Sequence, residues 1–304
     1  MAEQQQHVVV EQAVSPPLKE ELYNLQPQEI EFFKQQTGIQ DDDELKRHII
    51  DVQKEAYAVF PYTCIRRFGF TVLKISRFPA YQELLRLGKE RPGALFLDIG
   101  CCFGNDIRKA VADGFPVNQA IGSDLRQQFW DLGYKLFKDT PESFPVPFIQ
   151  GDVFDPAFLS PTPSAPPDTP LPPLHSLKTL TPLHGRLSII HASAFFHLFN
   201  EEQQHTLASR LALLLSPEPG SFIFGAHGGR TEKGFRTEDR FGRKREIPMF
   251  CHSPESWTEL WEKDIFKEGE VKVWTRLIET KRPEPGESSP GVSHLMLAWS
   301  VTRL

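Results

Sequence analysis

The stretch LFLDIGCCFGND, residues 95–106, joins a hydrophobic strand to the start of a polar helix through a glycine-containing turn. The apolar run closes on Asp98, and Gly100 and Gly104 bracket the turn. Because glycine lacks a Cβ, a ligand can approach the backbone of such a turn closely, and the helix that begins there presents free N–H groups. The stretch therefore predicts the ligand-binding strand, turn and helix of an α/β domain.

Segments typical of strands and helices alternate after this unit. Strands are expected in QAIGSDL (119–125), VPFIQGDV (146–153), RLSIIHAS (186–193) and GSFIFGAH (220–227), with helices after residues 105, 126 and 200. This order predicts a mostly parallel sheet with right-handed crossovers. Two later segments, EVKVWTRLIE (270–279) and HLMLAWSVTR (294–303), flank a turn rich in Pro, Gly and Ser and predict an antiparallel hairpin at the sheet edge.

Three other regions differ from this domain, which is expected over residues 93–304. Residues 1–26 are rich in Gln, Glu and Pro and predict a flexible tail or an arm that becomes ordered on another surface. Residues 27–92 carry apolar residues three and four apart and predict an N-terminal helical cap. The segment 156–185 is dense in proline, which favours a surface insertion, an inert linker rather than a substrate lid. The polar, basic run 230–245 is expected to be a solvated, mobile loop.

Composition limits the classes of function. The chain has 304 residues, 39% hydrophobic and 24% charged, as in an ordinary globular protein. Its formal charge of −6 argues against nucleic acid as the main partner, because phosphates are bound chiefly by clustered Lys and Arg. We expect a cytoplasmic protein, since no secretory signal begins the chain and no run approaches the roughly 20 apolar residues of a membrane span. The four cysteines lack metal-ligand spacing, so reduced thiols and no metal site are expected.

An acidic residue ends the strand after the glycine turn. Asp124 lies 26 residues after Asp98, where a carboxylate can accept both ribose hydroxyls of an adenosine; alternatively, it caps the next helix. A nicotinamide oxidoreductase shares this arrangement. Its fingerprint, Gly-x-Gly-x-x-Gly, would require glycine where Asn105 stands, so that class is disfavoured.

The ends of the fourth and fifth strands supply candidates for an acceptor site, because open sheets present ligand-contacting residues at that edge. The candidates are His191, Ser193, Phe196 and His197 in IIHASAFFHLF (189–199), His227 and Arg230 in GAHGGR, and Trp257 in the helix that Ser253 is expected to cap. Packing or capping is the alternative for each histidine, a core position for Trp257, and solvent exposure for Arg230.

LFLDIGCCFGND resembles motif I of the class I methyltransferases, acidic-x-Gly-x-Gly-x-Gly, with Cys102 in place of the middle glycine. The resemblance implies a Rossmann-like, mostly parallel seven-stranded sheet with an antiparallel edge hairpin, and S-adenosylmethionine as cofactor. It also implies that Asp152 contacts the adenine amino group and that Val153 packs against the ring. The implied cofactor residues are Asp98, Gly100, Gly104, Asp124, Leu125, Asp152 and Val153.

Four further segments make the resemblance more specific: residues 62–85, IRKAVADGFPV (107–117), HASAFFHLF (191–199) and FCHSPESW (250–257). With them, the chain after about residue 25 is similar to the methyltransferases of fungal meroterpenoid pathways, the austinol-type group. This resemblance implies methyl ester formation on the carboxyl of a dimethylorsellinate-derived intermediate, and a homodimer.

The chemistry of the acceptor decides whether a base is needed. A carboxylate is ionised at neutral pH and needs none, and Arg230 is a candidate to hold it. A phenol needs a base, for which His191 and His197 are the candidates. A phenol O-methyltransferase, a C-methyltransferase and a non-catalytic regulatory protein with the same fold stay open as alternatives.

Overall fold

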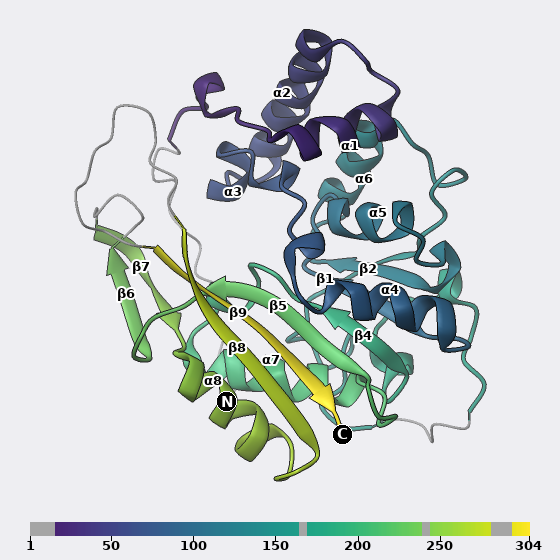
Figure 1. The fold of residues 1–304 in the computed structure, drawn as a ribbon, viewed down its shortest axis with the longest axis vertical. Helices are drawn as coiled ribbons and strands as arrows, with labels where there is room; N and C mark the ends of the chain where they lie inside the picture. Colours follow the sequence, from purple (N-terminus) through teal and green to yellow (C-terminus); the bar gives the residue numbers. More distant parts are fainter. Residues whose placement is uncertain (1–15, 164–168, 239–243, 281–293) are drawn as a thin grey trace, which may run out of the picture.

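A seven-stranded sheet of order β3-β2-β1-β4-β5-β9-β8 forms the centre of the molecule (Figure 1). The structure, a computed structural model, describes residues 16–163, 169–238, 244–280 and 294–304. The strands are β1 (Leu95–Ile99), β2 (Ala120–Asp124), β3 (Phe148–Gln150), β4 (Leu187–His191), β5 (Phe222–Gly228), β8 (Val271–Thr280) and β9 (His294–Arg303). The first five are mutually parallel, and β9 is antiparallel to both β5 and β8. This order is the class I methyltransferase sheet, and the expected hairpin inserts β9 beside β5 and leaves β8 at the edge.

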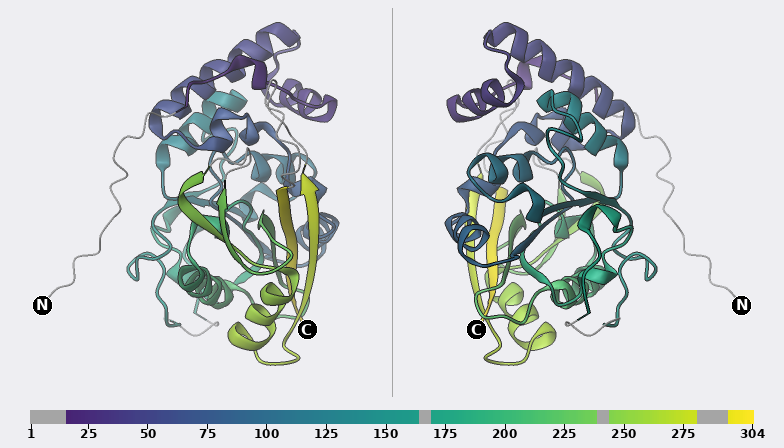
Figure 2. Two further views of the ribbon diagram at one scale, coloured as in Figure 1. Left: turned by 90° about the vertical axis from the view of Figure 1, so that its left-hand side faces the viewer. Right: turned by 90° about the vertical axis from the view of Figure 1, so that its right-hand side faces the viewer.

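Helices cover both faces of the sheet (Figure 2). One face packs against α4 (Tyr81–Glu90), α5 (Asn105–Ala112) and α6 (Gln127–Phe137), and the other against α7 (Glu201–Leu214), α8 (Pro254–Glu259) and the π-helical turn η8 (Leu260–Ile265). Successive strand residues explain the two layers, because side chains alternate between faces. Phe96 packs with the first layer and Leu97 with the second, and both are fully buried.

The N-terminal cap lies over α5 and α6 (Figure 1). It consists of η1 (Glu20–Leu22), α1 (Pro27–Thr37), α2 (Asp42–Val59), α3 (Thr63–Arg66), η2 (Gly69–Thr71) and η3 (Ile75–Arg77). Asp41 begins α2 by accepting a hydrogen bond from the Glu44 N–H at 2.8 Å. Phe33 stacks on Phe137 of α6 with centroids 5.1 Å apart, so the cap shares its hydrophobic core with the sheet domain.

Residues 16–26 form an arm ordered on the cap rather than a flexible tail; residues 1–15 lie outside the described residues. The Tyr57 hydroxyl donates to the Pro16 carbonyl at 2.7 Å, and the Arg66 guanidinium donates to the Pro17 carbonyl at 3.0 Å. Leu22 packs against the buried core of the cap. These contacts hold the segment on the cap, and its low apolar content gave no sign of them.

The proline-dense segment is only partly a surface insertion. It contains η5 (Leu174–Ser176) and η6 (Thr181–Leu183), and Leu159, Leu180 and Leu183 are fully buried beneath the sheet. Arg210 of α7 donates to the carbonyls of Val153 and Leu159 at 2.6 and 3.0 Å. Proline excluded regular helix as expected, but it did not exclude burial.

The run 230–245 was expected to be a loop, and this prediction is wrong for residues 234–238 and 244–245, whereas residues 239–243 lie outside the described residues. A separate two-stranded antiparallel sheet forms there from β6 (Gly234–Glu238) and β7 (Lys244–Cys251), with Phe235 opposite Phe250. The sequence did not predict these strands because charged residues obscure the alternation of apolar and polar residues that is typical of a strand.

Three structural observations bear on the expectations drawn from composition: the state of the cysteines, the character of the helices and the grouping of potential metal ligands. All four cysteines are free thiols, as predicted. In the described part of the chain, no helix has both the length and the apolar character that crossing a bilayer requires. The same residues hold no cluster of three or more His, Cys, Asp or Glu side chains placed to bind a metal.

Candidate active site

The glycine turn lies where the carboxyl ends of β1 and β2 meet. The N–H groups of Gly100 and Cys101 both donate to the Ser123 carbonyl of β2, at 2.8 and 3.2 Å. The Cys102 N–H donates to the Asp124 carboxylate at 2.9 Å. The structure thus brings the predicted Asp124 directly against the predicted turn.

Three residues of the turn have left-handed backbones: Gly100 (φ 71°), Cys102 (φ 50°) and Gly104 (φ 69°). At Cys102, where the family motif has glycine, this conformation costs on the order of 1–2 kcal/mol. Such strain persists only where the surroundings hold it, and it is common at binding sites.

The two glycines also make room for large side chains. A Cβ on Gly100 would lie 2.8 Å from the Phe195 ring, and one on Gly104 would lie 2.5 Å from the Trp130 ring. Both positions therefore require glycine for packing as well as for backbone conformation. The Phe195 ring comes from the segment that follows β4, so Gly100 brings this segment into contact with the turn.

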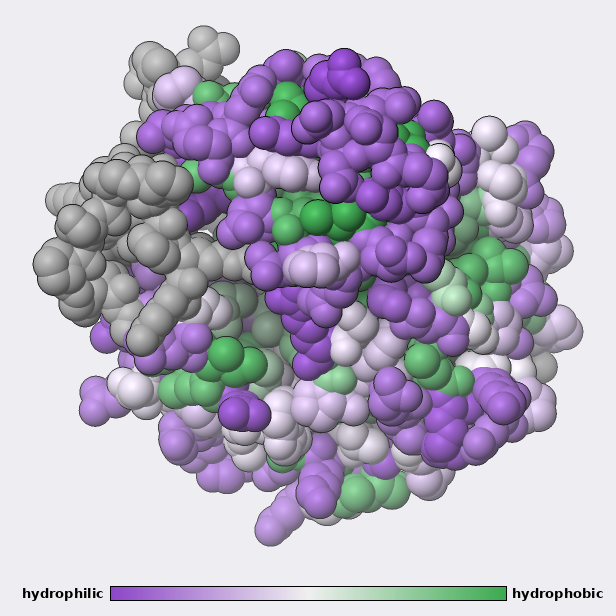
Figure 3. All heavy atoms as spheres, turned by 45° about the horizontal axis from the view of Figure 1, so that its top comes forward, coloured by the Kyte–Doolittle hydropathy of each residue, from purple (hydrophilic) through white to green (hydrophobic). Residues whose placement is uncertain are grey.

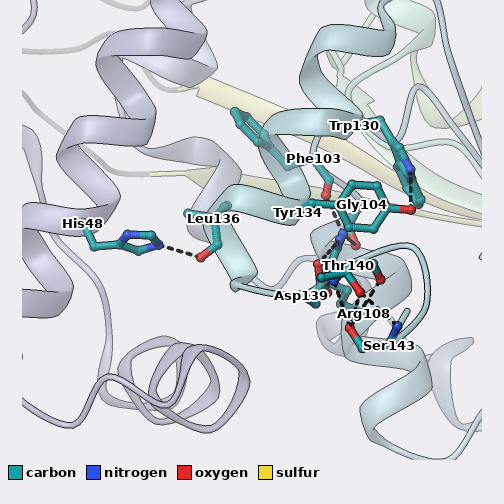
Figure 4. Close-up of polar contacts among 10 residues, drawn as sticks. All are labelled: His48, Phe103, Gly104, Arg108, Trp130, Tyr134, Leu136, Asp139, Thr140 and Ser143. Carbon is teal, nitrogen blue, oxygen red and sulfur yellow. Dashed lines mark hydrogen bonds and ion pairs between the residues drawn. The ribbon is translucent and has the colours of Figure 1, made fainter. Parts of the chain in front are cut away.

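Arg108 of α5 braces the turn from below (Figure 4). Its guanidinium donates to the Phe103 carbonyl at 2.7 Å and to both carboxylate oxygens of Asp139 at 2.7 and 2.9 Å. It is 1% exposed and lies over the Phe137 and Phe144 rings at 4.5 and 4.3 Å. In the same view, His48 of α2 contacts the Leu136 carbonyl at 2.9 Å and so ties the cap to α6.

The other expected cofactor residues differ in accessibility. Burial raises the pKa of the half-buried Asp124, and the N–H groups of Cys102 and Arg126 partly oppose the rise. Leu125 is 53% exposed beside it, an apolar surface open to a ligand. Asp152 is exposed and accepts from the Phe154 N–H at 2.9 Å. Val153, by contrast, is 6% exposed and packs in the core, which leaves it little surface for an adenine ring.

A buried hydrogen-bonded chain connects β1, β4 and the residue after it. The Asp98 carboxylate lies 2.8 Å from His191 Nδ1, and His191 Nε2 lies 2.7 Å from the Ser193 hydroxyl. Asp98 and His191 are 3% and 1% exposed, whereas Ser193 is half-buried. Burial lowers the pKa of His191, but the charge and hydrogen bond of Asp98 outweigh it and raise the pKa overall. Both ring nitrogens are occupied, so His191 reaches a bound molecule only through Ser193.

Three residues that we expected at an acceptor pocket lie in an aromatic core instead. Phe196, His227 and Trp257 are each 0% exposed. The Phe196 and Trp257 rings meet edge to face at 4.9 Å, and His227 accepts from the Trp299 indole N–H at 3.0 Å. In this conformation they have no surface to offer a substrate, and we assign them to the core.

The remaining two candidates lie near the end of β5. His197 is half-buried, and its Nδ1 accepts from the Gly228 N–H at 3.1 Å. Arg230 is exposed, and its guanidinium donates to the carbonyls of Glu232 and Phe235 at 3.2 and 3.4 Å. Arg230 therefore binds its own loop in this structure, and a carboxylate acceptor would have to compete with these weak contacts.

The cap contributes residues that sequence reasoning missed. Tyr62 hydrogen-bonds with Arg126, beside Asp124. Burial raises the pKa of Asp98, and the charges of His191 and of the half-buried Lys74 partly oppose that rise. The segment around Lys74 is fixed on α5, because Asn105 donates to the Val72 carbonyl at 3.3 Å and Asp106 accepts from the Ile75 N–H at 3.0 Å. Lys74 belongs to residues 62–85, one of the segments that carry the family resemblance, and no spacing rule points to it.

Exposed hydrophobic side chains lie in the middle of a largely hydrophilic surface when the cap is brought forward (Figure 3).

A hollow of about 250 Å³ lies near the amino end of β5, beside Phe78, Phe222 and Trp274. Its lining includes Phe222, at the amino end of β5, and contains no residue of the glycine turn and not Asp124, so this hollow is distinct from the proposed cofactor site.

Comparison with known proteins gives two kinds of similarity. A family model described as the meroterpenoid methyltransferase N-terminal domain matches residues 18–71. The chain is 33% identical over 266 residues to methyltransferase ausD of Penicillium brasilianum, covering 86% of this chain and 84% of that protein. It is 32% identical over 262 residues to the asnovolin E/chermesin D methyltransferase nvfJ of Aspergillus novofumigatus, covering 86% and 83%. It is 33% identical over 235 residues to the O-methyltransferase phiE of a fungal species, covering 76% and 69%.

Solved structures are more distant. The 1,6-didemethyltoxoflavin-N1-methyltransferase of Burkholderia thailandensis shares 13% identity with a TM-score of 0.48, covering 88% of this chain and 92% of that chain. The magnesium protoporphyrin IX methyltransferase of Synechocystis shares 12% identity with a TM-score of 0.41, covering 90% of each chain. The strand order described above, rather than these similarities, defines the fold.

Proposed function

The chain belongs to the family of fungal meroterpenoid methyltransferases, and we propose that it converts a carboxylate of a meroterpenoid intermediate into its methyl ester. The methyl donor is S-adenosylmethionine, and the acceptor carboxyl belongs to a dimethylorsellinate-derived moiety. The meroterpenoid class of the acceptor is supported by the family model and by a relative named for methylating asnovolin E and chermesin D, and the dimethylorsellinate-derived carboxyl is what the resemblance implies.

The residues present fit the donor. Asp124 offers a half-buried carboxylate to ribose hydroxyls, Leu125 an exposed apolar side chain to the adenine, and the glycine turn a close approach to backbone N–H groups. Asp152, exposed two residues after β3, is the residue that the resemblance assigns to the adenine amino group. S-adenosylmethionine, when bound, supplies an electrophilic methyl group on a sulfonium.

The observation that carries the choice of acceptor is the occupation of His191. Both of its ring nitrogens are hydrogen-bonded and its side chain is buried, so it has no free nitrogen to take a proton from a substrate. A carboxylate acceptor is already ionised near pH 7 and needs no base. The protein then has only to align the carboxylate oxygen with the methyl group and exclude water.

A phenolic acceptor is the second candidate, because Ser193 links His191 to the surface of the site. A phenol could pass its proton to Ser193 while the Ser193 proton moves to His191 Nε2, with Asp98 stabilising the imidazolium. The 2.7 Å contact between Ser193 and His191 is the observation that favours it.

The two acceptors are separated by product chemistry. The purified chain is incubated with S-adenosylmethionine and a matched set of compounds: an aromatic acid with a free phenol, its methyl ester, and its phenol ether. We expect a methylated product from the acid and from the phenol ether, with the added methyl released by mild alkaline hydrolysis. A product from the methyl ester, stable to alkali, would favour the phenol. No product from any member, with cofactor binding intact, would favour the regulatory alternative.

A further inference from the structure

Three half-buried phenylalanines form a row along the carboxyl edge of the sheet. Phe154 follows β3, and its ring meets Phe199 edge to face at 4.8 Å; Phe199 in turn meets Phe195 at 5.4 Å. All three lie on the surface of the core on the α7 side of the sheet. The row extends from the end of β3 to the end of β1, the direction in which the proposed cofactor must lie.

Phe195 occupies the β1 end of this row and touches the glycine turn. A Cβ on Gly100 would lie 2.8 Å from Cδ2 of the Phe195 ring and 3.3 Å from Cγ. The ring is therefore in contact with the backbone at the first glycine of the turn.

The strained backbone of Ala194 determines the direction of the Phe195 ring. Ala194 has a left-handed backbone (φ 54°), and its N–H donates to the Ala226 carbonyl of β5 at 2.6 Å. Two residues earlier, the Ala192 N–H donates to the Phe224 carbonyl at 2.9 Å. Because β5 holds the strand up to Ala194, the turn there sends Phe195 toward Gly100 and Phe196 into the core. The cost, on the order of 1–2 kcal/mol, is typical of residues that serve a site.

The place expected for the cofactor's charge follows from the residues proposed to hold its other groups. If Asp124 at the end of β2 held the ribose, the methionine part would extend along the glycine turn toward β1 and β4. The sulfonium joins the ribose to the methionine part, so it would lie near Gly100. The buried Asp98 is already paired with His191 at 2.8 Å, whereas the half-buried Phe195 ring contacts Gly100 directly and has a negative electrostatic face.

We propose that Phe195 forms the wall against which the sulfonium of S-adenosylmethionine lies, and that its ring discriminates the charged donor from the neutral product S-adenosylhomocysteine. This inference rests on the proposed function. A cation over an aromatic face is stabilised by the ring quadrupole, and the stabilisation ends when the methyl group leaves and the sulfur becomes neutral. Phe195 thus favours donor binding and product release.

Calorimetry on the full chain tests the inference, with the dissociation constants of donor and product measured separately. Phe195→Leu should weaken S-adenosylmethionine roughly 2- to 30-fold, the range of a cation–aromatic contact, and S-adenosylhomocysteine less than about twofold. Phe195→Tyr should restore donor affinity. Phe199→Leu is the matched control, since it shortens the same row away from Gly100 and should shift both constants alike.

An equal change for donor and product in Phe195→Leu, or no change for either, would overturn the inference and leave the proposed function intact. If Phe195→Leu does not fold, a fluorinated phenylalanine at position 195 keeps the shape of the ring and weakens its negative face; it should lower donor affinity alone. If the unmodified chain binds neither ligand, the proposed function fails, and the inference fails with it.

Discussion

Replacing Arg108 by Leu removes the brace beneath the glycine turn while keeping an apolar stem. The wild-type guanidinium makes two bonds to Asp139 and one at 2.7 Å to the Phe103 carbonyl. Removing one member of a buried ion pair costs about 3–5 kcal/mol, because the other charge is left unpaired. The Asp139 side chain is 17% exposed and can recruit some water, so we expect the lower part of this range, about 3 kcal/mol.

Urea unfolding followed by tryptophan fluorescence measures this loss, because Trp130 packs against Gly104 and reports on the same region. Arg86→Leu is the matched control: Arg86 pairs with Glu83 and Glu90 on the exposed face of α4 and should leave the unfolding midpoint nearly unchanged. Calorimetry with S-adenosylhomocysteine should also show weaker binding to Arg108→Leu under conditions where the variant is folded.

The double variant Arg108→Leu with Asp139→Asn completes the test, because neutralising Asp139 removes the unpaired charge. It should recover part of the lost stability. If Arg108→Leu shifts the midpoint no more than Arg86→Leu does, the turn does not depend on this brace and the reasoning is refuted.

Three further predictions concern the cofactor, pH and assembly. Asp124→Ala should weaken S-adenosylhomocysteine roughly 10- to 150-fold in calorimetry, equivalent to about 1.5–3 kcal/mol for hydrogen bonds to a charged group; unchanged affinity would remove Asp124 from the site. Burial lowers the pKa of His252 to about 4, so the unfolded chain binds more protons below about pH 6.5 and the free energy of unfolding should fall by about 2 kcal/mol between pH 7 and pH 5. His252→Gln should reduce that fall in urea titrations at the two pH values, and an identical fall would contradict the assignment. Light scattering after gel filtration should give twice the chain mass, the homodimer that the resemblance implies, and a monomer mass would exclude it.

Sequence patterns were sufficient for the elements of the sheet domain, because strand and helix periodicity is local and the glycine turn marks where β1 ends. The same patterns failed where contacts between residues far apart in the sequence determine whether a segment is ordered or buried. Residues 16–26 look unstructured by composition, yet Tyr57 and Arg66 bind their carbonyls. Leu180 stands among prolines and is nevertheless fully buried.

Side-chain direction was the other limit. HASAFFHLF contains two adjacent phenylalanines, and position in the sequence alone predicts Phe196 as a site residue. The left-handed backbone of Ala194 reverses the assignment, and no sequence rule anticipates φ 54° at an alanine. The two ring nitrogens of His191 are a similar case, because their partners Asp98 and Ser193 come from a neighbouring strand and from the turn after β4.

The shared core of the cap and the sheet domain has a consequence for how these enzymes can diversify. The family model of the N-terminal domain matches residues 18–71. This segment does not form a complete hydrophobic core by itself, because Phe103, Phe129 and Phe137 of the sheet domain belong to the same core. If the cap of one relative replaced that of another, its core residues would therefore have to pack against phenylalanines from a different parent, unless α6 were exchanged with the cap. We expect cap and α6 to evolve as a unit, so that chimaeras joined near residue 75 fold poorly while chimaeras carrying both segments from one parent fold well. Substrate range in this family would then change through paired substitutions across that boundary, rather than by trading caps as interchangeable parts.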